Sequence, residues 1–134
     1  MSSRVNFYKP EWCDAHQQFA FSQAVKIGDT VYISGTTSCA EGFVPEHAGD
    51  FRAQFGNAYA KIQETLGHFG LGMNHVVKEI MFTRDMAALV ANMDVRKGFY
   101  GAGPFPAATA VEIAQLFFPE LLIEIEIVAL DRRD

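Results

Sequence analysis

The last segment of the chain follows a period of two. Residues 121–130 read LLIEIEIVAL, and this alternation predicts a half-buried β-strand. One face of the strand would hold Leu121, Ile123, Ile125, Ile127 and Ala129, and the other face Leu122, Glu124, Glu126, Val128 and Leu130. The second face sets two carboxylates among branched aliphatic side chains. We therefore expect another copy of the chain to cover that face.

Two stretches follow the helical period instead. Residues 51–69 place apolar side chains at intervals of three, four and seven, with Asp50 as an N-terminal cap and Gly70 as the stop. The apolar positions are Phe51, Phe55, Ala58, Tyr59, Ile62, Leu66 and Phe69. A second helix is predicted from about Met86 to Tyr100, with Asp85 as its cap.

The remaining apolar runs predict a sheet. The segments predicted as extended are 19–25, 30–34, 76–83 and 106–116. Gly28 and Asp29 supply the turn of a hairpin between the first two segments. Because both faces of 76–83 are largely apolar, this strand should be central in the sheet.

The order of these elements predicts an α+β protein. Two helices would cover one face of a mixed sheet, within a single domain that spans residues 1–134. Residues 1–18 and 36–49 are expected as loops, although 6–8 could form a short edge strand.

Composition narrows the possible partners. The chain has 134 residues, of which 49% are hydrophobic and 20% charged, and its formal net charge is −5. An acidic chain with scattered Lys and Arg argues against a surface for nucleic acid or anionic membranes. The apolar runs are far shorter than the ~20 residues of a membrane span, and the N-terminus has no apolar signal region, so we expect a cytoplasmic protein.

Glu124 is the main candidate for chemistry in the final strand. A carboxylate at the edge of an apolar junction has a raised pKa, which suits a general acid or base near neutral pH. The alternative is that Glu124 and Glu126 only form hydrogen bonds across a subunit boundary. Cys39 could line a cleft, but no His has a spacing that identifies a base partner for it. The four His are dispersed, so no metal site is expected.

Six stretches, in unbroken order, resemble the RidA/YjgF family of small enamine/imine deaminases. They are residues 21–25, 31–35, 76–86, 106–107, 110–113 and 123–126. The resemblance implies a chorismate-mutase-like α+β fold, in which a homotrimer packs its sheets into a central β-barrel and holds a small-molecule ligand in clefts between subunits. It also implies hydrolysis of a reactive enamine or imine to a 2-keto acid and ammonia, without a cofactor.

The resemblance assigns roles to particular positions. Glu124 corresponds to the carboxylate that holds and activates water, and Gly35 to a backbone contact in the cleft. Phe21 stands where many members have a cleft Tyr, so it keeps the aromatic wall and lacks the hydroxyl. Asn92 matches an asparagine of the second helix, for which we expect a structural role, as we do for Glu126.

Ala108 departs from the family pattern. Deaminases of the family have an Arg there that makes a forked contact with the substrate carboxylate. Charge-assisted hydrogen bonds contribute ~1.5–3 kcal/mol each, so the loss of such a pair would weaken binding of a carboxylate-bearing imine by two orders of magnitude or more. Either the substrate lacks that carboxylate or another cation replaces the Arg. Arg84 and Arg96 are the nearest candidates in the sequence, but we expect both to be solvated surface residues.

Two other functions stay open from the sequence. The first is a non-catalytic trimer that binds or senses a small molecule, with the family's cleft but without its anchor. The second is ribonuclease activity, which is attached to some members of the family by name. The acidic charge balance and the absence of a basic groove in the sequence argue against the second function.

Overall fold

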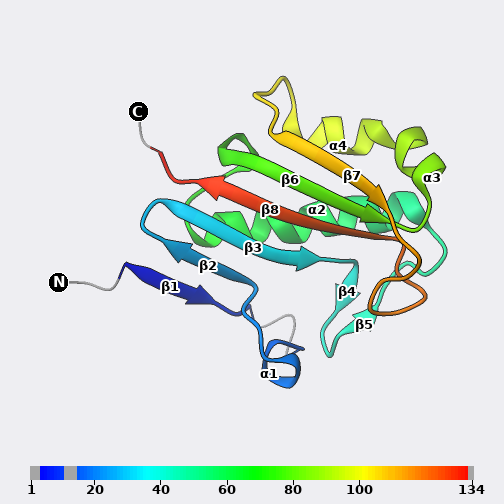
Figure 1. Ribbon diagram of the computed structural model, residues 1–134, viewed down its shortest axis with the longest axis horizontal. Helices are drawn as coiled ribbons and strands as arrows, with labels where there is room; N and C mark the ends of the chain where they lie inside the picture. Colours follow the sequence, from blue (N-terminus) through cyan, green and yellow to red (C-terminus); the bar gives the residue numbers. More distant parts are fainter. Residues whose placement is uncertain (1–3, 11–14, 133–134) are drawn as a thin grey trace.

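A six-stranded sheet with helices on one side forms the body of the molecule (Figure 1). The structure is a computed structural model, and it describes residues 4–10 and 15–132. The strands of the sheet lie in the order β1-β2-β3-β8-β6-β7. Their bounds are β1 Val5–Tyr8, β2 Ala24–Ile27, β3 Thr30–Thr36, β6 Val76–Thr83, β7 Ala107–Glu112 and β8 Ile123–Leu130. Neighbours are antiparallel except β6 and β7, which are parallel.

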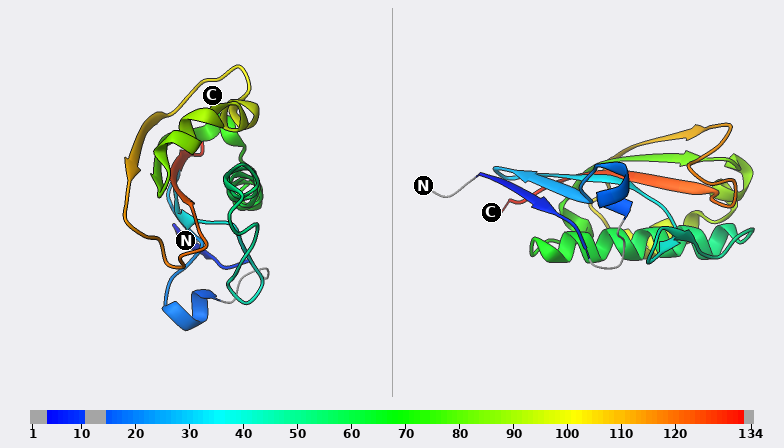
Figure 2. Two further views of the ribbon diagram at one scale, coloured as in Figure 1. Left: turned by 90° about the vertical axis from the view of Figure 1, so that its right-hand side faces the viewer. Right: turned by 90° about the horizontal axis from the view of Figure 1, so that it is seen from below.

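All helices except the short first one pack as a second layer behind the sheet (Figure 2). Their bounds are α1 Ala15–Phe19, α2 Phe51–His68, α3 Met86–Ala91 and α4 Met93–Tyr100, with a 3-10 turn, η1, at Met73–His75. A separate two-stranded ribbon consists of β4 Cys39–Ala40 and β5 Val44–Pro45. This arrangement confirms the predicted α+β class and the mixed sheet. Strand β6 is paired on both sides, between β8 and β7, but it lies one strand from the edge of the sheet and only one of its faces is fully buried. No helix in the described residues is long and apolar enough to cross a membrane.

The core lies between β8 and α2. Ile123, Ile125, Ile127 and Ala129 are at most 1% exposed on the helix side of β8. The facing side of α2 is buried as its periodicity predicted, and Asp50 caps the helix by accepting a hydrogen bond from the Ala53 amide at 3.0 Å. Burying apolar surface stabilises a fold by about 25 cal/mol per Å², so this contact holds the helix layer against the sheet.

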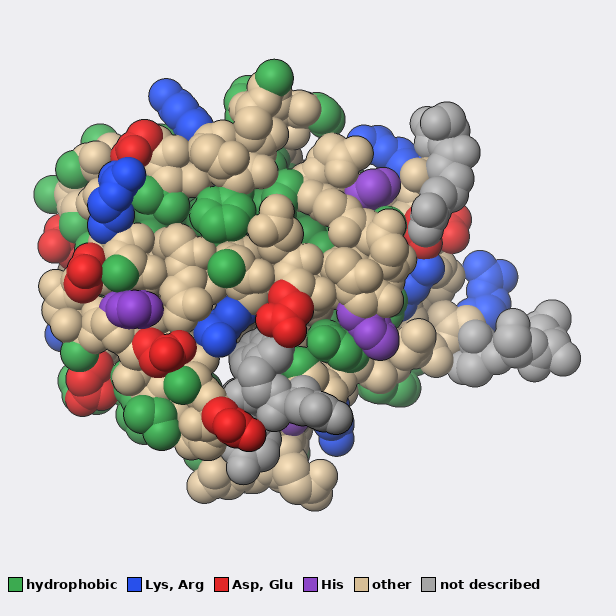
Figure 3. All heavy atoms as spheres, turned by 180° about the vertical axis from the view of Figure 1, so that it is seen from behind, with side chains coloured by type: hydrophobic (Ala, Val, Ile, Leu, Met, Phe, Trp, Pro, Cys, Tyr) green, Lys and Arg blue, Asp and Glu red, His purple; other side chains and the backbone are tan. Residues whose placement is uncertain are grey.

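The outer surface of the helix layer has no single charge sign. Figure 3 shows acidic and basic side chains interspersed on this side of the molecule, with apolar side chains between them. The mixture agrees with the scattered charges of the sequence.

The hairpin between β2 and β3 forms as predicted. Ile27 pairs with Thr30, and Gly28 takes the left-handed conformation of the turn, with φ 59°. The predicted strand at 19–25 begins too early, because β2 starts only at Ala24 and Phe19 ends α1. The prediction of loops was also wrong for β1 and α1 and for the ribbon of β4 and β5, because short elements give little periodicity.

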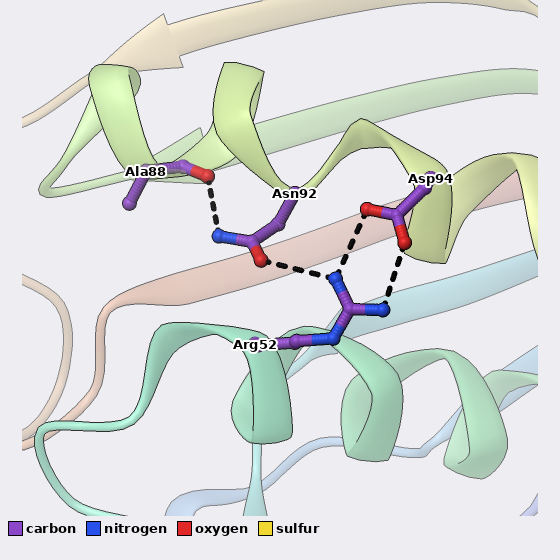
Figure 4. A network of polar contacts seen from close by, with 4 residues as sticks. All are labelled: Arg52, Ala88, Asn92 and Asp94. Atoms are coloured by element: carbon purple, nitrogen blue, oxygen red, sulfur yellow. Dashed lines mark hydrogen bonds and ion pairs between the residues drawn. The ribbon is translucent and has the colours of Figure 1, made fainter.

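The second predicted helix is broken at Asn92, between α3 and α4. The Asn92 side chain donates to the Ala88 carbonyl at 2.8 Å and accepts from Arg52 at 3.3 Å (Figure 4). Asn92 therefore satisfies the backbone where α3 ends, which is a structural role. Arg52 also forms a forked pair with Asp94 at 3.0 and 2.7 Å. Because both partners are mostly exposed, solvent screens this pair and it contributes little to stability.

Glu79 is a charged residue inside the core, and it is 0% exposed. It accepts hydrogen bonds from Tyr59 at 2.6 Å and Tyr100 at 3.1 Å, and Arg96 donates to it at 2.6 Å. Burial, and then the nearby Glu79 carboxylate, raise the pKa of the Tyr59 and Tyr100 phenols, so both remain donors. The network joins β6 to α2 and α4, and it satisfies a charge that would otherwise be costly to bury.

Replacing Tyr59 with Phe should lower the free energy of unfolding by about 1–3 kcal/mol. The change removes the shortest phenol contact to the buried carboxylate and leaves the ring in place. Tyr8→Phe is the matched control, because the Tyr8 ring packs against His68 and Phe69 and no hydrogen bond joins its hydroxyl to the described residues. Chemical denaturation of both variants checks this, and equal stability of the two would contradict a structural role for the Tyr59 hydroxyl.

Candidate functional site

A bulge in β3 brings Gly35 against Glu124. Ile33 pairs with Ile127 and Thr36 with Ile125, so β3 has one extra residue at this point. A Cβ placed on Gly35 would lie 2.7 Å from Glu124 Cδ and 2.8 Å from its Oε2. Gly35 does not have a positive φ. Space for the carboxylate is therefore what requires a glycine here.

The Glu124 carboxylate borders a pocket of about 210 Å³. The lining residues are Phe19, Phe21, Gly35, Thr37, Phe43, Phe117 and Glu124. They come from the end of α1, the segment before β2, β3 and the residue after it, the turn between β4 and β5, the loop before β8, and β8 itself. Segments far apart in the chain thus meet at one carboxylate.

Three phenylalanines of the lining form a cluster of touching rings. The ring centroids of Phe43 lie 5.6 Å from Phe19 and 5.1 Å from Phe117, and Phe19 lies 4.9 Å from Phe117. Phe43 has φ 58°, a left-handed conformation that costs a residue with a Cβ roughly 1–2 kcal/mol. Its aromatic contacts offset this strain. Strained residues concentrate at functional sites, so the position of Phe43 supports a binding role for this wall.

The loop that carries Phe117 is anchored to the core by Gln54. The Gln54 amide donates to the carbonyls of Glu120 at 2.9 Å and His47 at 3.0 Å, and its oxygen accepts from the Leu122 amide at 2.8 Å. The Gln54 side chain is fully buried on α2. Gln54 therefore holds the segment between Phe117 and β8 against α2, which fixes this part of the pocket wall.

A smaller hollow of about 30 Å³ adjoins the pocket beyond Phe21. It reaches Gln23, Thr36 and Cys39, and it is large enough for a water molecule. Gln23 lies beneath it, with its amide donating to Thr36 Oγ1 at 3.0 Å and its oxygen 3.2 Å from His16 Nε2. This buried network ties α1 to the strand that carries Gly35.

The environment of Glu124 favours a proton acceptor. Burial raises the pKa of the Glu124 carboxyl, and the neighbouring Glu126 charge raises it further. Within the described part of the chain, no group donates a hydrogen bond to this carboxylate. A half-buried carboxylate without a partner has its oxygens available for a ligand or for water.

The structure brings together three of the four predicted site residues. Glu124, Phe21 and Gly35 share the pocket, whereas Ala108 lies on the exposed strand β7, beside Glu79 in the register. Two strand spacings separate β7 from β8, so Ala108 does not reach the pocket of the same chain. Cys39 lines the smaller hollow, with its sulfur 3.3 Å from Thr37 Oγ1.

The prediction of two solvated arginines was wrong. The Arg96 side chain is 13% exposed and pairs with Glu79, because a buried carboxylate needs a cation. Arg84 donates to the Pro119 carbonyl, and its Nε is buried without a hydrogen-bond partner among the described residues. Neither Arg lines the pocket beside Glu124.

Sequence reasoning missed Phe19, Phe43 and Phe117 as pocket residues. Phe19 falls in the predicted strand 19–25 and Phe43 in the predicted loop 36–49, whereas Phe117 lies between two predicted strands, so nothing in the sequence links the three. One signal was available. Each of these phenylalanines lies in or beside a segment with turn residues, where a large apolar side chain is unusual and can mark a binding surface.

Comparison with known proteins places the chain in a family. A family model described as "Endoribonuclease L-PSP" matches residues 14–131. A protein from Dermatophagoides farinae named 2-iminobutanoate/2-iminopropanoate deaminase is 33% identical over 96 residues, which are 72% of this chain and 74% of that protein. The chain belongs to the RidA/YjgF family.

Solved structures of RidA/YjgF proteins share the fold. Rv2704 from Mycobacterium tuberculosis, described as a member of the YjgF/YER057c/UK114 family, superposes with a TM-score of 0.81 at 26% identity, over 94% of this chain and 98% of that one. RidA from the Antarctic bacterium Psychrobacter has a TM-score of 0.74 at 31% identity, over 82% of this chain and 87% of that one.

Residues that could hold a metal are not grouped in the described part of this RidA/YjgF chain. Among the described residues, no three His, Cys, Asp or Glu side chains lie close enough to bind a metal ion together. That the reaction needs no cofactor stays a prediction.

Proposed function

We propose that this RidA/YjgF protein hydrolyses small reactive enamines or imines to a carbonyl compound and ammonia. The observation that carries the proposal is the half-buried, raised-pKa carboxylate of Glu124 at the wall of an aromatic pocket. The name of the Dermatophagoides relative, which is a deaminase, supports the same reaction class.

Glu124 is the catalytic base in this proposal. An enamine first tautomerises to the imine, and a water molecule held by the carboxylate loses a proton to Glu124 as its oxygen bonds to the imine carbon. The proton then passes to nitrogen. The carbinolamine then passes its hydroxyl proton to nitrogen by way of Glu124, and ammonia leaves as the C–N bond breaks and the carbonyl forms. Phe21 forms an aromatic wall beside the reacting atoms. Gly35 leaves the space that the Glu124 carboxylate occupies.

A homotrimer with clefts between subunits is part of the proposal. The sheet face opposite the helices is uncovered in a single chain, and it includes Tyr32 and Phe7, which are 49% and 66% exposed. Val111 of β7 is also exposed on this face. An apolar face of this extent favours association. Sedimentation should give three times the chain mass, and a single-chain mass would contradict this arrangement.

Ala108 gives the proposed enzyme an altered substrate choice. The exposed edge strand β7 would meet a neighbouring subunit's cleft, with a methyl group where a carboxylate anchor would stand. Ala108→Arg should then raise the rate with 2-aminoacrylate by about two orders of magnitude, the value of a forked charged contact.

Hydrolysis of a panel of imines tests the main proposal. Freshly generated 2-aminoacrylate and several neutral imines are mixed with the purified protein, and ammonia release is compared with that in buffer. No acceleration for any imine would reject the enzyme. It would then favour the alternative of a non-catalytic binding or regulatory trimer, which the neutral Ala108 position supports.

Ribonuclease activity is not favoured by the surface. The family model has that name, but the net charge of this chain is −5, and the helix side mixes both charge signs (Figure 3). RNA cleavage that persists through purification and disappears in Glu124→Gln would reverse this conclusion.

Replacing Glu126 with Gln should shift the acid limb of the pH–rate profile to lower pH. Activity requires the Glu124 carboxylate, so it falls as the pH drops through its pKa, which the Glu126 charge raises. Without that charge the pKa falls and activity persists at lower pH. The rate on the plateau above the pKa should stay within about twofold, and an unmoved limb would show that burial alone sets the pKa.

A further inference from the structure

We propose that the pocket accepts imines that have an aromatic or branched apolar group and no carboxylate. The inference rests on the proposed function and specifies its substrate class. The reaction that supplies such an imine is the oxidation of a primary amine.

The walls of the pocket are apolar. Four phenylalanines line it, and the remaining lining groups are Gly35, the hydroxyl-bearing Thr37 and the single carboxylate. A dry cavity of about 150 Å³ is enough for benzene, so about 210 Å³ holds a phenyl ring with a short C=N arm. The touching rings of Phe19, Phe43 and Phe117 offer faces and edges to such a group.

The charge at the pocket excludes an anionic substrate. Glu124 is the charged lining residue, and Glu126 lies two positions away on the same strand face. No Lys or Arg of the described residues lines this pocket, since Arg96 is held by Glu79 and Arg84 by the Pro119 carbonyl. A substrate carboxylate would face Glu124 without a compensating cation from the described residues of the same chain, and the proposed neighbouring subunit would present the methyl group of its Ala108 there.

The same charge favours a protonated imine. An iminium ion is attracted by Glu124 and by the faces of the surrounding phenyl rings. Protonation also makes the imine carbon a better acceptor for the water that Glu124 holds. The pocket therefore matches a small cation with an apolar tail.

The chemistry of this substrate defines its source. A primary amine R–CH2–NH2 loses two electrons and two protons to a flavin or to O2 and becomes R–CH=NH. Water then adds to the carbon, the C–N bond breaks, and R–CHO and ammonia leave. Oxidation of an amino acid would instead give an imine with a carboxylate, which this pocket disfavours.

Two imines with the same side chain test the inference. Oxidation of phenethylamine by an amine oxidase gives an imine without a carboxylate, which we call the neutral imine because its unprotonated form has no charge. Oxidation of phenylalanine by an amino acid oxidase gives the imine with the same side chain and a carboxylate. We expect the rate over buffer to be at least about tenfold greater for the neutral imine. Equal rates, or a preference for the carboxylated imine, would overturn this substrate class and leave the hydrolase standing.

A cation in the pocket wall should abolish the preference. Phe117→Arg introduces one beside Glu124, and the preference for the neutral imine should fall by at least about tenfold. Phe105→Arg is the matched control, because Phe105 is 57% exposed, close to the 55% of Phe117, and does not line the pocket. An unchanged preference in Phe117→Arg, or an equal change in Phe105→Arg, would contradict the inference.

Binding separates the two proposals if no imine is hydrolysed. Calorimetry measures the affinity of the pocket for phenethylamine and for phenylacetate, neither of which can be hydrolysed. Tighter binding of phenethylamine by at least about tenfold would sustain the recognition of an apolar cation while the proposed hydrolase fails. Tighter binding of phenylacetate would overturn the recognition itself.

Discussion

Glu124→Gln should reduce imine hydrolysis by about 10²–10⁴-fold, the usual contribution of a general base. Gln keeps the size and shape of the side chain beside Gly35, but it cannot accept the proton of the attacking water. The phenylalanine wall remains, but the attraction of the Glu124 charge for an iminium ion is lost, so KM should rise while kcat carries the larger loss. Steady-state rates with the neutral imine measure both quantities.

The same substitution should not destabilise the protein. The folded-state pKa of Glu124 is raised, so ionisation is less favourable in the folded chain than in the unfolded one. The wild type therefore loses stability relative to the Gln variant as the pH rises from the ordinary Glu range through the raised pKa. At pH 7 the variant should be at least as stable in chemical denaturation.

Two results would contradict the role of Glu124. A variant with nearly wild-type activity would show that another group activates water. A variant that loses both activity and stability would show that the carboxylate holds the subunits or strands together, which is the structural alternative. Glu126→Gln is the control on the same strand face, and it should keep its plateau activity.

The strand and helix at the centre of the fold could be predicted because their signals are local. The burial of Ile123, Ile125 and Ile127 repeats the alternation seen in the sequence, and the period of residues 51–69 matches the buried side of α2. The same alternation places both Glu124 and Glu126 between apolar neighbours, and it was the family resemblance that singled out Glu124.

The pocket wall could not be predicted, because its residues are neighbours only after folding. Phe19, Phe43 and Phe117 lie in three separate segments with no common period. The role of Arg96 was hidden in the same way. Its partner Glu79 lies 17 positions earlier, within a strand whose apolar pattern gave no sign of a buried charge.

Gly35→Ala should lower kcat by about 10²-fold, because it displaces the catalytic carboxylate. The added Cβ would lie 2.7 Å from Glu124 Cδ, which is closer than a Cβ approaches another heavy atom in folded proteins. Because the end of the Glu side chain is flexible, we expect it to move and the strand to stay in place. A displacement of about 1 Å at a reacting group is enough for a loss of this size. The displaced carboxylate would also be better solvated, so the acid limb of the pH–rate profile should shift toward ordinary Glu values.

A second glycine provides the control for Gly35→Ala. Gly67 lies in α2 with nothing within 4 Å of a Cβ placed on it. Gly67→Ala should leave kcat unchanged and raise the free energy of unfolding by about 0.5–1 kcal/mol, because alanine favours the helix. If Gly35→Ala keeps kcat within about threefold of the wild type, the activity of the Glu124 carboxylate does not depend on its close contact with residue 35. A loss of folding in Gly35→Ala but not in Gly67→Ala would mean that the backbone at the bulge moves and the Glu124 side chain does not. The close approach of Gly35 to Glu124 would then be required for strand pairing rather than for the chemistry.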